Sequence, residues 1–260
     1  SYFLTHHAPT EESFDNVCFD MAQDAQGIMY FAMKAGVLEF DGRDWDLIPG
    51  AGAVYALNRN QAGDIFWVGA KGFGKIGLDK QGFKKIQYLS DSNVNNVFQT
   101  LAIDGHVYFL SENKIFLYES GSQKAETLIS GNGQNMFTGM FELFGAVYVQ
   151  TERNTTFRVE NGKLMYVNLN FSGNVLFYSR IADTYLLGTS DNRVYTCGKD
   201  LIVKQVPIND QPYADANVVI SGTWVDEHLL ALGHRHIAHI SGPMELRLTR
   251  ERLAGFQQAF

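Results

Sequence analysis

Histidines gather near the end of the sequence in a pattern that could bind a metal ion. In GHRHIAHI, residues 233–240, His234 and His236 stand two positions apart, which places both side chains on one face of a strand. Zinc takes four ligands, or three and a water molecule. Neither an HExxH motif nor a cysteine partner accompanies the pair. We therefore expect no metal site and interpret these histidines as structural or solvent-facing.

Two further motifs approach nucleotide and calcium sites without meeting their requirements. GFGKIG, residues 72–77, fits G-x-G-x-x-G, but a turn rather than a helix follows it, so no helix N-terminus receives a phosphate. DGRDWD, residues 41–46, has carboxylates at positions 1, 4 and 6, which is not the spacing of an EF-hand loop. We expect turns at both places and no cofactor.

No catalytic residue can be assigned from the sequence. The nucleophile elbow G-x-S-x-G is absent. A pair of carboxylates for glycoside chemistry would come from distant parts of the chain and leave no local motif. We expect a protein that is not an enzyme, and a carbohydrate-active enzyme stays open as an alternative.

The charge balance argues against nucleic acid as a partner. The 260 residues carry a formal net charge of −7, and no run of Lys and Arg builds the basic stripe that binds a phosphate backbone. No stretch approaches the ~18 consecutive apolar residues of a membrane span, so we expect no transmembrane segment in this chain. The opening SYFLTHHAP lacks the pattern of a signal peptide, as expected for a mature or trimmed fragment.

One hydrophobic hairpin recurs along the chain and must position any site. Each copy is a strand, a polar or Gly-containing turn and a second strand, and the copies follow at steps of 36 to 44 residues. Their matched apolar positions are Tyr30, Phe66, Tyr108, Tyr148, Leu186 and Leu230. An apolar run precedes each hairpin and a short fourth strand follows it. Four strands in about forty residues make one β-propeller blade.

We therefore predict an all-β fold, a single β-propeller domain over residues 1–260 with four-stranded blades. The tail RERLAGFQQAF is either a helix or the first strand of an incomplete seventh blade, so six and seven blades both stay open. A row of separate sandwich domains would need about a hundred residues for each. The six complete repeats are placed at about residues 14–52, 53–95, 96–135, 136–174, 175–217 and 218–249.

The first two repeats resemble the two-component regulator propeller repeat. The last four keep the hydrophobic rhythm and lose most Asp-Gly pairs, so the resemblance covers about a third of the chain. In the first repeat the matching positions are Asp24, Gly27, Tyr30, Gly36, Val37, Leu38, Phe40, Asp41 and Gly42, with Trp45 after them. The second repeat keeps Gly63, Phe66, Trp67, Gly69, Gly72 and Gly74.

This resemblance implies the sensor region of a Bacteroidetes-type regulator whose later part is a triple-tyrosine domain. It implies a periplasmic or otherwise extracytoplasmic location and a small polar ligand such as an oligosaccharide. It also implies a downstream signalling domain as partner, and because a closed propeller is stiff, a homodimer whose geometry changes is a second expected partner. The expected function is ligand sensing or partner binding in a two-component type of signal transduction and transcription regulation. A carbohydrate-active propeller enzyme and a protein-interaction scaffold are the alternatives.

Binding is expected on one face of the propeller. The turns between the second and third strands of a blade emerge on the same face as the loops between blades, and loops on a rigid scaffold commonly carry function. These loops are rich in Asn, Ser, Gly and Asp. The candidate ligand-binding residues are Lys34, Lys71, Phe73, Asn113, Arg153, Arg193, Tyr213, His234, Arg235 and His236.

Overall fold

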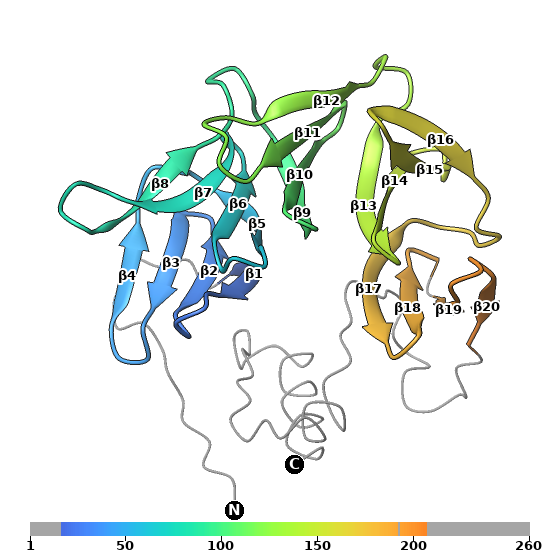
Figure 1. Cartoon of the computed structure of the whole chain (residues 1–260), viewed down its shortest axis with the longest axis horizontal. Helices are drawn as coiled ribbons and strands as arrows, with labels where there is room; N and C mark the ends of the chain where they lie inside the picture. The colour runs from blue at the N-terminus through green and yellow to red at the C-terminus, as the bar shows by residue number, and fades with distance from the viewer. Residues whose placement is uncertain (1–16, 192, 207–260) are drawn as a thin grey trace, which may run out of the picture. The chain divides into compact units, whose positions relative to one another are not determined.

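The computed structural model describes residues 17–191 and 193–206, which form five four-stranded antiparallel sheets. Nearly all of them belong to one compact unit, Phe19–Thr223. Each sheet consists of consecutive strands in chain order (Figure 1). No helix occurs among the described residues, and the predicted all-β propeller fold of four-stranded blades is confirmed. The sixth predicted repeat, residues 218–249, and the tail after it lie outside the described residues.

The strands of each sheet are short. The first sheet contains β1 (Cys18–Gln23), β2 (Met29–Met33), β3 (Gly36–Phe40) and β4 (Trp45–Ile48), and the second β5 (Val54–Arg59), β6 (Ile65–Gly69), β7 (Gly72–Leu78) and β8 (Lys84–Tyr88). The third contains β9 (Val97–Ile103), β10 (His106–Ser111), β11 (Lys114–Glu119) and β12 (Glu126–Ser130). The fourth contains β13 (Phe137–Leu143), β14 (Ala146–Thr151), β15 (Thr156–Glu160) and β16 (Lys163–Val167), and the fifth β17 (Val175–Ile181), β18 (Thr184–Thr189), β19 (Val194–Cys197) and β20 (Val203–Gln205).

Hydrophobic side chains fill the interfaces between neighbouring sheets. Successive residues of a strand point to opposite faces, so one strand can serve two interfaces. On β6, Trp67 packs in the cluster that contains Tyr30 of the first sheet, whereas Phe66 packs in the cluster that contains Phe109 of the third. Two similar clusters join the third sheet to the fourth and the fourth to the fifth. The cores therefore lie between sheets, and each sheet depends on its neighbours for burial.

Polar side chains on the first strands of the sheets bond the backbone of the next first strand. Asp20 accepts a hydrogen bond from the backbone N–H of Leu57 at 2.8 Å. Asn58 donates to the carbonyl of Thr100 at 3.2 Å. Gln99 makes two bonds, donating to the carbonyl of Met140 at 2.5 Å and accepting from its N–H at 2.7 Å. We name these contacts the inner-strand bonds; they fix the heights of the first four sheets against one another.

Tight turns explain the Asp-Gly signals of the first two repeats. In the turn after β1, the Asp24 side chain accepts hydrogen bonds from the N–H groups of Gln26 and Ile28. Asp79, after β7, accepts in the same way from Gln81 and Phe83. The carboxylate thus takes the place of a backbone carbonyl in holding the turn.

The motif GFGKIG lies in a strand rather than in a turn. It forms the first six residues of β7, and the turn that begins at Asp79 follows it. Its glycines are explained by close packing, because a Cβ atom added at Gly74 would lie 1.9 Å from the backbone oxygen of Gln87. Glycine in a strand commonly marks such an approach of another backbone.

Gly74→Ala should therefore destabilise the fold. Relief of the clash requires β7 and β8 to move apart, which we expect to lower the free energy of unfolding by about 1–3 kcal/mol, as for other overpacked sites. Gly139→Ala is the matched control, since a Cβ there would have its nearest neighbour at 3.7 Å. Urea unfolding of both variants measures the difference, and equal midpoints would contradict the packing explanation.

Candidate functional site

Two sets of loops share one face of the sheets, as the sequence predicts. We name the turns between second and third strands central turns, the connections between sheets linking loops, and the surface they form together the loop face. The N–H of Ala70, in the central turn of the second sheet, donates to the carbonyl of Ala53 in a linking loop at 2.9 Å. Ser190 of the fifth sheet donates in the same way to Asn174 at 2.8 Å. Each of these bonds continues a strand pair of its own sheet, so the backbone fixes the central turn against the linking loop that precedes that sheet.

The predicted residues within the described part of the chain come from five different sheets. Lys34, Lys71, Asn113, Arg153 and Arg193 are exposed and stand one in each central turn. They are therefore distributed over the loop face, one on each sheet, and do not form one cluster by themselves. Tyr213, His234, Arg235 and His236 lie outside the described residues.

Phe73 was placed in a central turn by the sequence, and the structure corrects that placement. It is the second residue of β7, and its side chain is fully buried. Its ring stacks on Phe109 of the third sheet, with centroids 4.1 Å apart. The turn before β7 contains only Ala70 and Lys71, so the next apolar side chain already points into the core.

The corner between the fourth and fifth sheets is the most organised part of the loop face. Asp191 accepts a hydrogen bond from the Ser172 hydroxyl at 2.6 Å and another from the Thr189 hydroxyl. Arg193 Nη1 lies 3.5 Å from Asp191 Oδ2 and donates to Ser172 at 3.3 Å. Burial by itself would raise the pKa of Asp191, but these hydroxyls and the guanidinium outweigh it and lower the pKa. The corner thus presents a charged, oriented Arg193 to solvent.

A buried glutamine supports this corner from below. Gln150 is 1% exposed, donates to the carbonyl of Gly173 at 3.3 Å and accepts from the N–H of Val175 at 2.6 Å. It thereby ties β14 to the linking loop that carries Ser172. Sequence reasoning missed Gln150, Ser172 and Asp191, and the one available signal was a polar residue in the otherwise apolar run AVYVQ.

Asparagine is the characteristic side chain of the loop face. Amides offer donors and acceptors together, which suits hydroxyl-rich ligands and exposed peptide groups. The side-chain oxygens of Asn135 and Asn174 are buried without a hydrogen-bond partner in the described structure. The asparagines in these turns and loops are Asn93, Asn95, Asn96, Asn113, Asn132, Asn135, Asn154, Asn168, Asn170 and Asn174.

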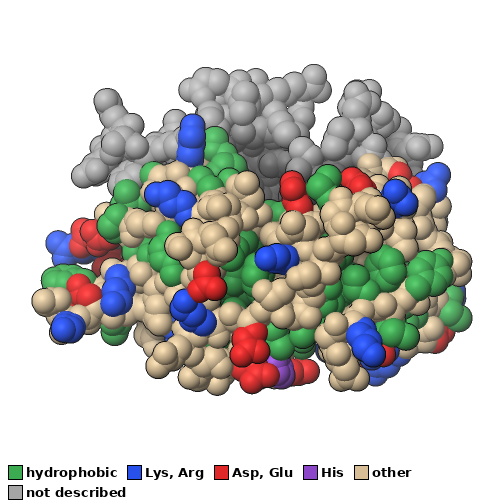
Figure 2. Space-filling view, turned by 90° about the horizontal axis from the view of Figure 1, so that it is seen from above, with side chains coloured by type: hydrophobic (Ala, Val, Ile, Leu, Met, Phe, Trp, Pro, Cys, Tyr) green, Lys and Arg blue, Asp and Glu red, His purple; other side chains and the backbone are tan. Residues whose placement is uncertain are grey.

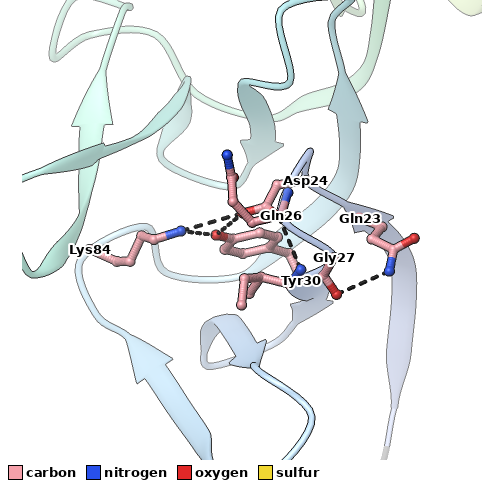
Figure 3. Close-up of polar contacts among 7 residues, drawn as sticks. Gln23, Asp24, Gln26, Gly27, Tyr30 and Lys84 are labelled. Atoms are coloured by element: carbon pink, nitrogen blue, oxygen red, sulfur yellow. Dashed lines mark hydrogen bonds and ion pairs between the residues drawn. The ribbon is translucent and has the colours of Figure 1, made fainter.

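A second polar cluster lies on the opposite side, between the first and second sheets (Figure 3). The Tyr30 hydroxyl donates to Asp24 at 3.0 Å, and the Lys84 ammonium contacts both, lying 3.6 Å from Asp24 Oδ2. Burial, the charge of Glu39 and the bond to Asp24 raise the pKa of Tyr30. The Tyr30 hydroxyl therefore stays protonated as a hydrogen-bond donor, and the cluster joins the first two sheets.

Charges are mixed over the surface. On the side shown in Figure 2, Lys and Arg alternate with Asp and Glu, and hydrophobic side chains lie between them. Within residues 17–191 and 193–206, no group of three His, Cys, Asp or Glu side chains is arranged to hold a metal ion. The same residues include no helix with the length and hydropathy that a membrane crossing needs.

Comparison with known proteins supports the fold alone. No family model and no curated protein matches the chain. Among solved structures it is similar to virginiamycin B lyase from Staphylococcus aureus, with a TM-score of 0.59 and 12% identity over 76% of this chain and 72% of the lyase. A streptogramin B lyase structure gives 0.55 and 13% identity over 74% and 68% of the two chains. The WD40 β-propeller domain of Doa1 gives 0.55 and 13% over 74% and 69%.

Gln150→Ala should destabilise the protein without altering exposed loop chemistry. It leaves the N–H of Val175 and the carbonyl of Gly173 without their side-chain partner, which typically costs about 1–3 kcal/mol for buried groups. Gln134→Ala is the control, because Gln134 is exposed in a linking loop. We expect only the first variant to shift the urea midpoint. A shift of the same size in both would show that Gln150 is not a special support.

Asp24→Asn should show a stability loss that depends on pH. Burial raises the pKa of Asp24, but the N–H groups of Ile28 and Gln26, the Tyr30 hydroxyl and Lys84 outweigh it, and the pKa falls below its ordinary 3.8. Such a carboxylate stabilises the fold above pH 3.8 and loses that effect as the pH falls through the lower folded value.

At pH 7 we therefore expect Asp24→Asn to lower the free energy of unfolding by about 1.5–3 kcal/mol, since charged hydrogen bonds are lost. The difference from the parent protein should shrink below pH 4. Asp44→Asn, at an exposed turn position, serves as the control. A pH-independent difference measured by denaturant unfolding would argue against a charged Asp24 in the folded protein.

Proposed function

We propose that this chain is a ligand-sensing or partner-binding propeller region of a signalling protein and that the loop face is its binding surface. The observation that carries the proposal is the loop face itself: its turns and linking loops are bonded by the backbone, and each sheet contributes one exposed basic or amide side chain. Loops held in this way keep their shape while their side chains bind.

The ligand class that suits this surface is polar and hydroxyl-rich. Amide side chains can pair with hydroxyl groups as donors and as acceptors, and Arg193 adds an oriented guanidinium. An oligosaccharide has this chemistry, and so has an exposed loop of a partner domain. The resemblance of the first two repeats to two-component regulator propellers supports a sensory role and an extracytoplasmic location.

Signalling would pass through packing rather than through reshaping of a sheet. The inner-strand bonds and the buried clusters make each sheet stiff against its neighbours. Occupancy of the loop face would then be read by a downstream domain or by the geometry of a homodimer. Only a ligand that binds two arrangements with different affinity can shift them.

A thermal-shift screen tests this proposal. A ligand that binds only the folded state raises the melting temperature in proportion to RT ln(1 + [L]/Kd). We expect at least one oligosaccharide in a panel of plant and bacterial glycans to do so. Arg193→Gln should weaken that binding about tenfold or more, because a hydrogen bond to a charged group contributes about 1.5–3 kcal/mol.

Lys163→Gln is the matched control, since Lys163 begins β16, away from the central turns and linking loops. Its binding should equal that of the parent protein. Arg153→Gln is tested in parallel. If the ligand raises the melting temperature of both the Arg193→Gln and the Arg153→Gln variant as much as that of the parent protein, the loop face is not the binding site. Release of a shortened sugar during incubation would contradict a purely sensory role and favour an enzyme.

A further inference from the structure

A pocket opens between the third and fourth sheets at the end opposite the loop face. Its volume is about 290 Å³. Two turns frame it: Asp104–Gly105 joins β9 to β10, and Phe144–Gly145 joins β13 to β14. All four of these residues have positive φ, which is the geometry of type I′ hairpin turns. The turns are therefore tight, and Gly145 adds no side chain to close the entrance.

The two walls of the pocket carry opposite charges. Asp104 stands on the third sheet and Arg158 on the fourth, and both line the pocket. Arg158 Nε lies 3.1 Å from Glu160 Oε1 on its own strand. No hydrogen bond or ion pair within the described residues joins Asp104 to Arg158. The pocket thus holds an anionic and a cationic group that are not paired with each other, and the guanidinium of Arg158 is paired with Glu160 through Nε alone.

One wall adds two rings and a hydroxyl. His106 and Tyr108 lie two positions apart on β10, and their ring centroids are 6.5 Å apart. The Nε2 atom of His106 lies 3.9 Å from Glu119 Oε1 on the neighbouring strand β11. Burial and the charge of Asp104 raise the pKa of Tyr108, so its hydroxyl stays protonated.

At the same end of the interface between the fourth and fifth sheets, hydrogen bonds between side chains fill the space that is open as a pocket between the third and fourth. There the Tyr185 hydroxyl donates to the Glu142 carboxylate at 2.6 Å, and Glu142 also accepts from the N–H of Gly145 at 2.6 Å. Tyr108 of the third sheet makes no such bond within the described residues. Its hydroxyl is half-buried and can donate to water or to a molecule bound in the pocket.

We propose that this pocket binds a free α-amino acid. The α-carboxylate pairs with the Arg158 guanidinium and the Tyr108 hydroxyl, the α-ammonium with Asp104, and the side chain packs along the rings of His106 and Tyr108. Guanidinium and carboxylate match as a two-point contact. Ligand pockets commonly measure about 300–1,000 Å³, so 290 Å³ suits one amino acid and is too small for an oligosaccharide. This site is independent of the loop face.

The test uses the whole chain and the twenty standard amino acids, each added separately, with thermal shift followed by calorimetric titration. We expect a subset to raise the melting temperature of the parent protein. The N-acetyl and carboxamide derivatives of those amino acids should bind at least tenfold more weakly, because each removes one charge. Arg158→Gln and Asp104→Asn should each weaken binding at least tenfold.

Three controls keep the result interpretable. Melting curves without ligand establish that both variants fold, and Arg158→Lys, which keeps the charge but loses the two-point contact, should bind with intermediate affinity. Arg153→Gln on the loop face should bind as the parent does. The proposal is overturned if no amino acid stabilises the protein, if the blocked derivatives bind equally well, or if neither pocket variant weakens binding. The loop-face variants report on a different surface. A negative result for amino acids therefore does not bear on the proposed function of the loop face, which the oligosaccharide screen tests separately.

Discussion

The first strands of neighbouring sheets are not joined by a β-ladder, and among the first four sheets side-chain hydrogen bonds connect them instead. Asp20, Asn58 and Gln99 each bond a backbone group of the next first strand. A buried backbone group that loses its partner costs about 1–3 kcal/mol, whereas apolar packing alone tolerates sliding. The inner-strand bonds therefore help to set the height at which each of the first four sheets meets its neighbour.

At the loop-face end, a backbone hydrogen bond also crosses between sheets, from the N–H of Phe137 in the fourth sheet to the carbonyl of Glu112 in the central turn of the third at 2.7 Å. At the other end, polar clusters close the interface between the first and second sheets and that between the fourth and fifth, through Asp24 with Lys84 and Glu142 with Tyr185. The interface between the third and fourth sheets lacks such a closure among the described residues, although Gln99 fixes its middle. The pocket lies at the end of this interface, beyond the hydrophobic cluster, where no polar cluster of the described residues fills the space between the two sheets.

The sequence predicts the features that depend on local chain geometry. The hairpin rhythm and the Asp24 and Asp79 turns involve residues within a few positions of one another, and the strands of the first five repeats appear where expected, except that β7 includes the GFGKIG motif predicted as a turn. Phe73 was misplaced because its burial depends on Phe109, a residue of another sheet. Gln150 and Arg158 likewise gain their surroundings from partners that no local spacing reveals. For the same reason, the loop-face residues could be placed on one face but not arranged within it.

A sensor needs a ligand that contacts two parts able to move against each other, because a contact within one part cannot favour either arrangement. Lys34 or Asn113 alone, each on a single tight turn, does not meet this condition. The corner formed by Ser172, Asp191 and Arg193 does, since it combines a linking loop with the central turn of the fifth sheet. The pocket meets it too, with Asp104 and Arg158 on different sheets. Because the inner-strand bonds and the buried clusters hold neighbouring sheets stiffly, a ligand that joins two such elements would be sensed, as proposed above, by a downstream domain or a second copy of the chain.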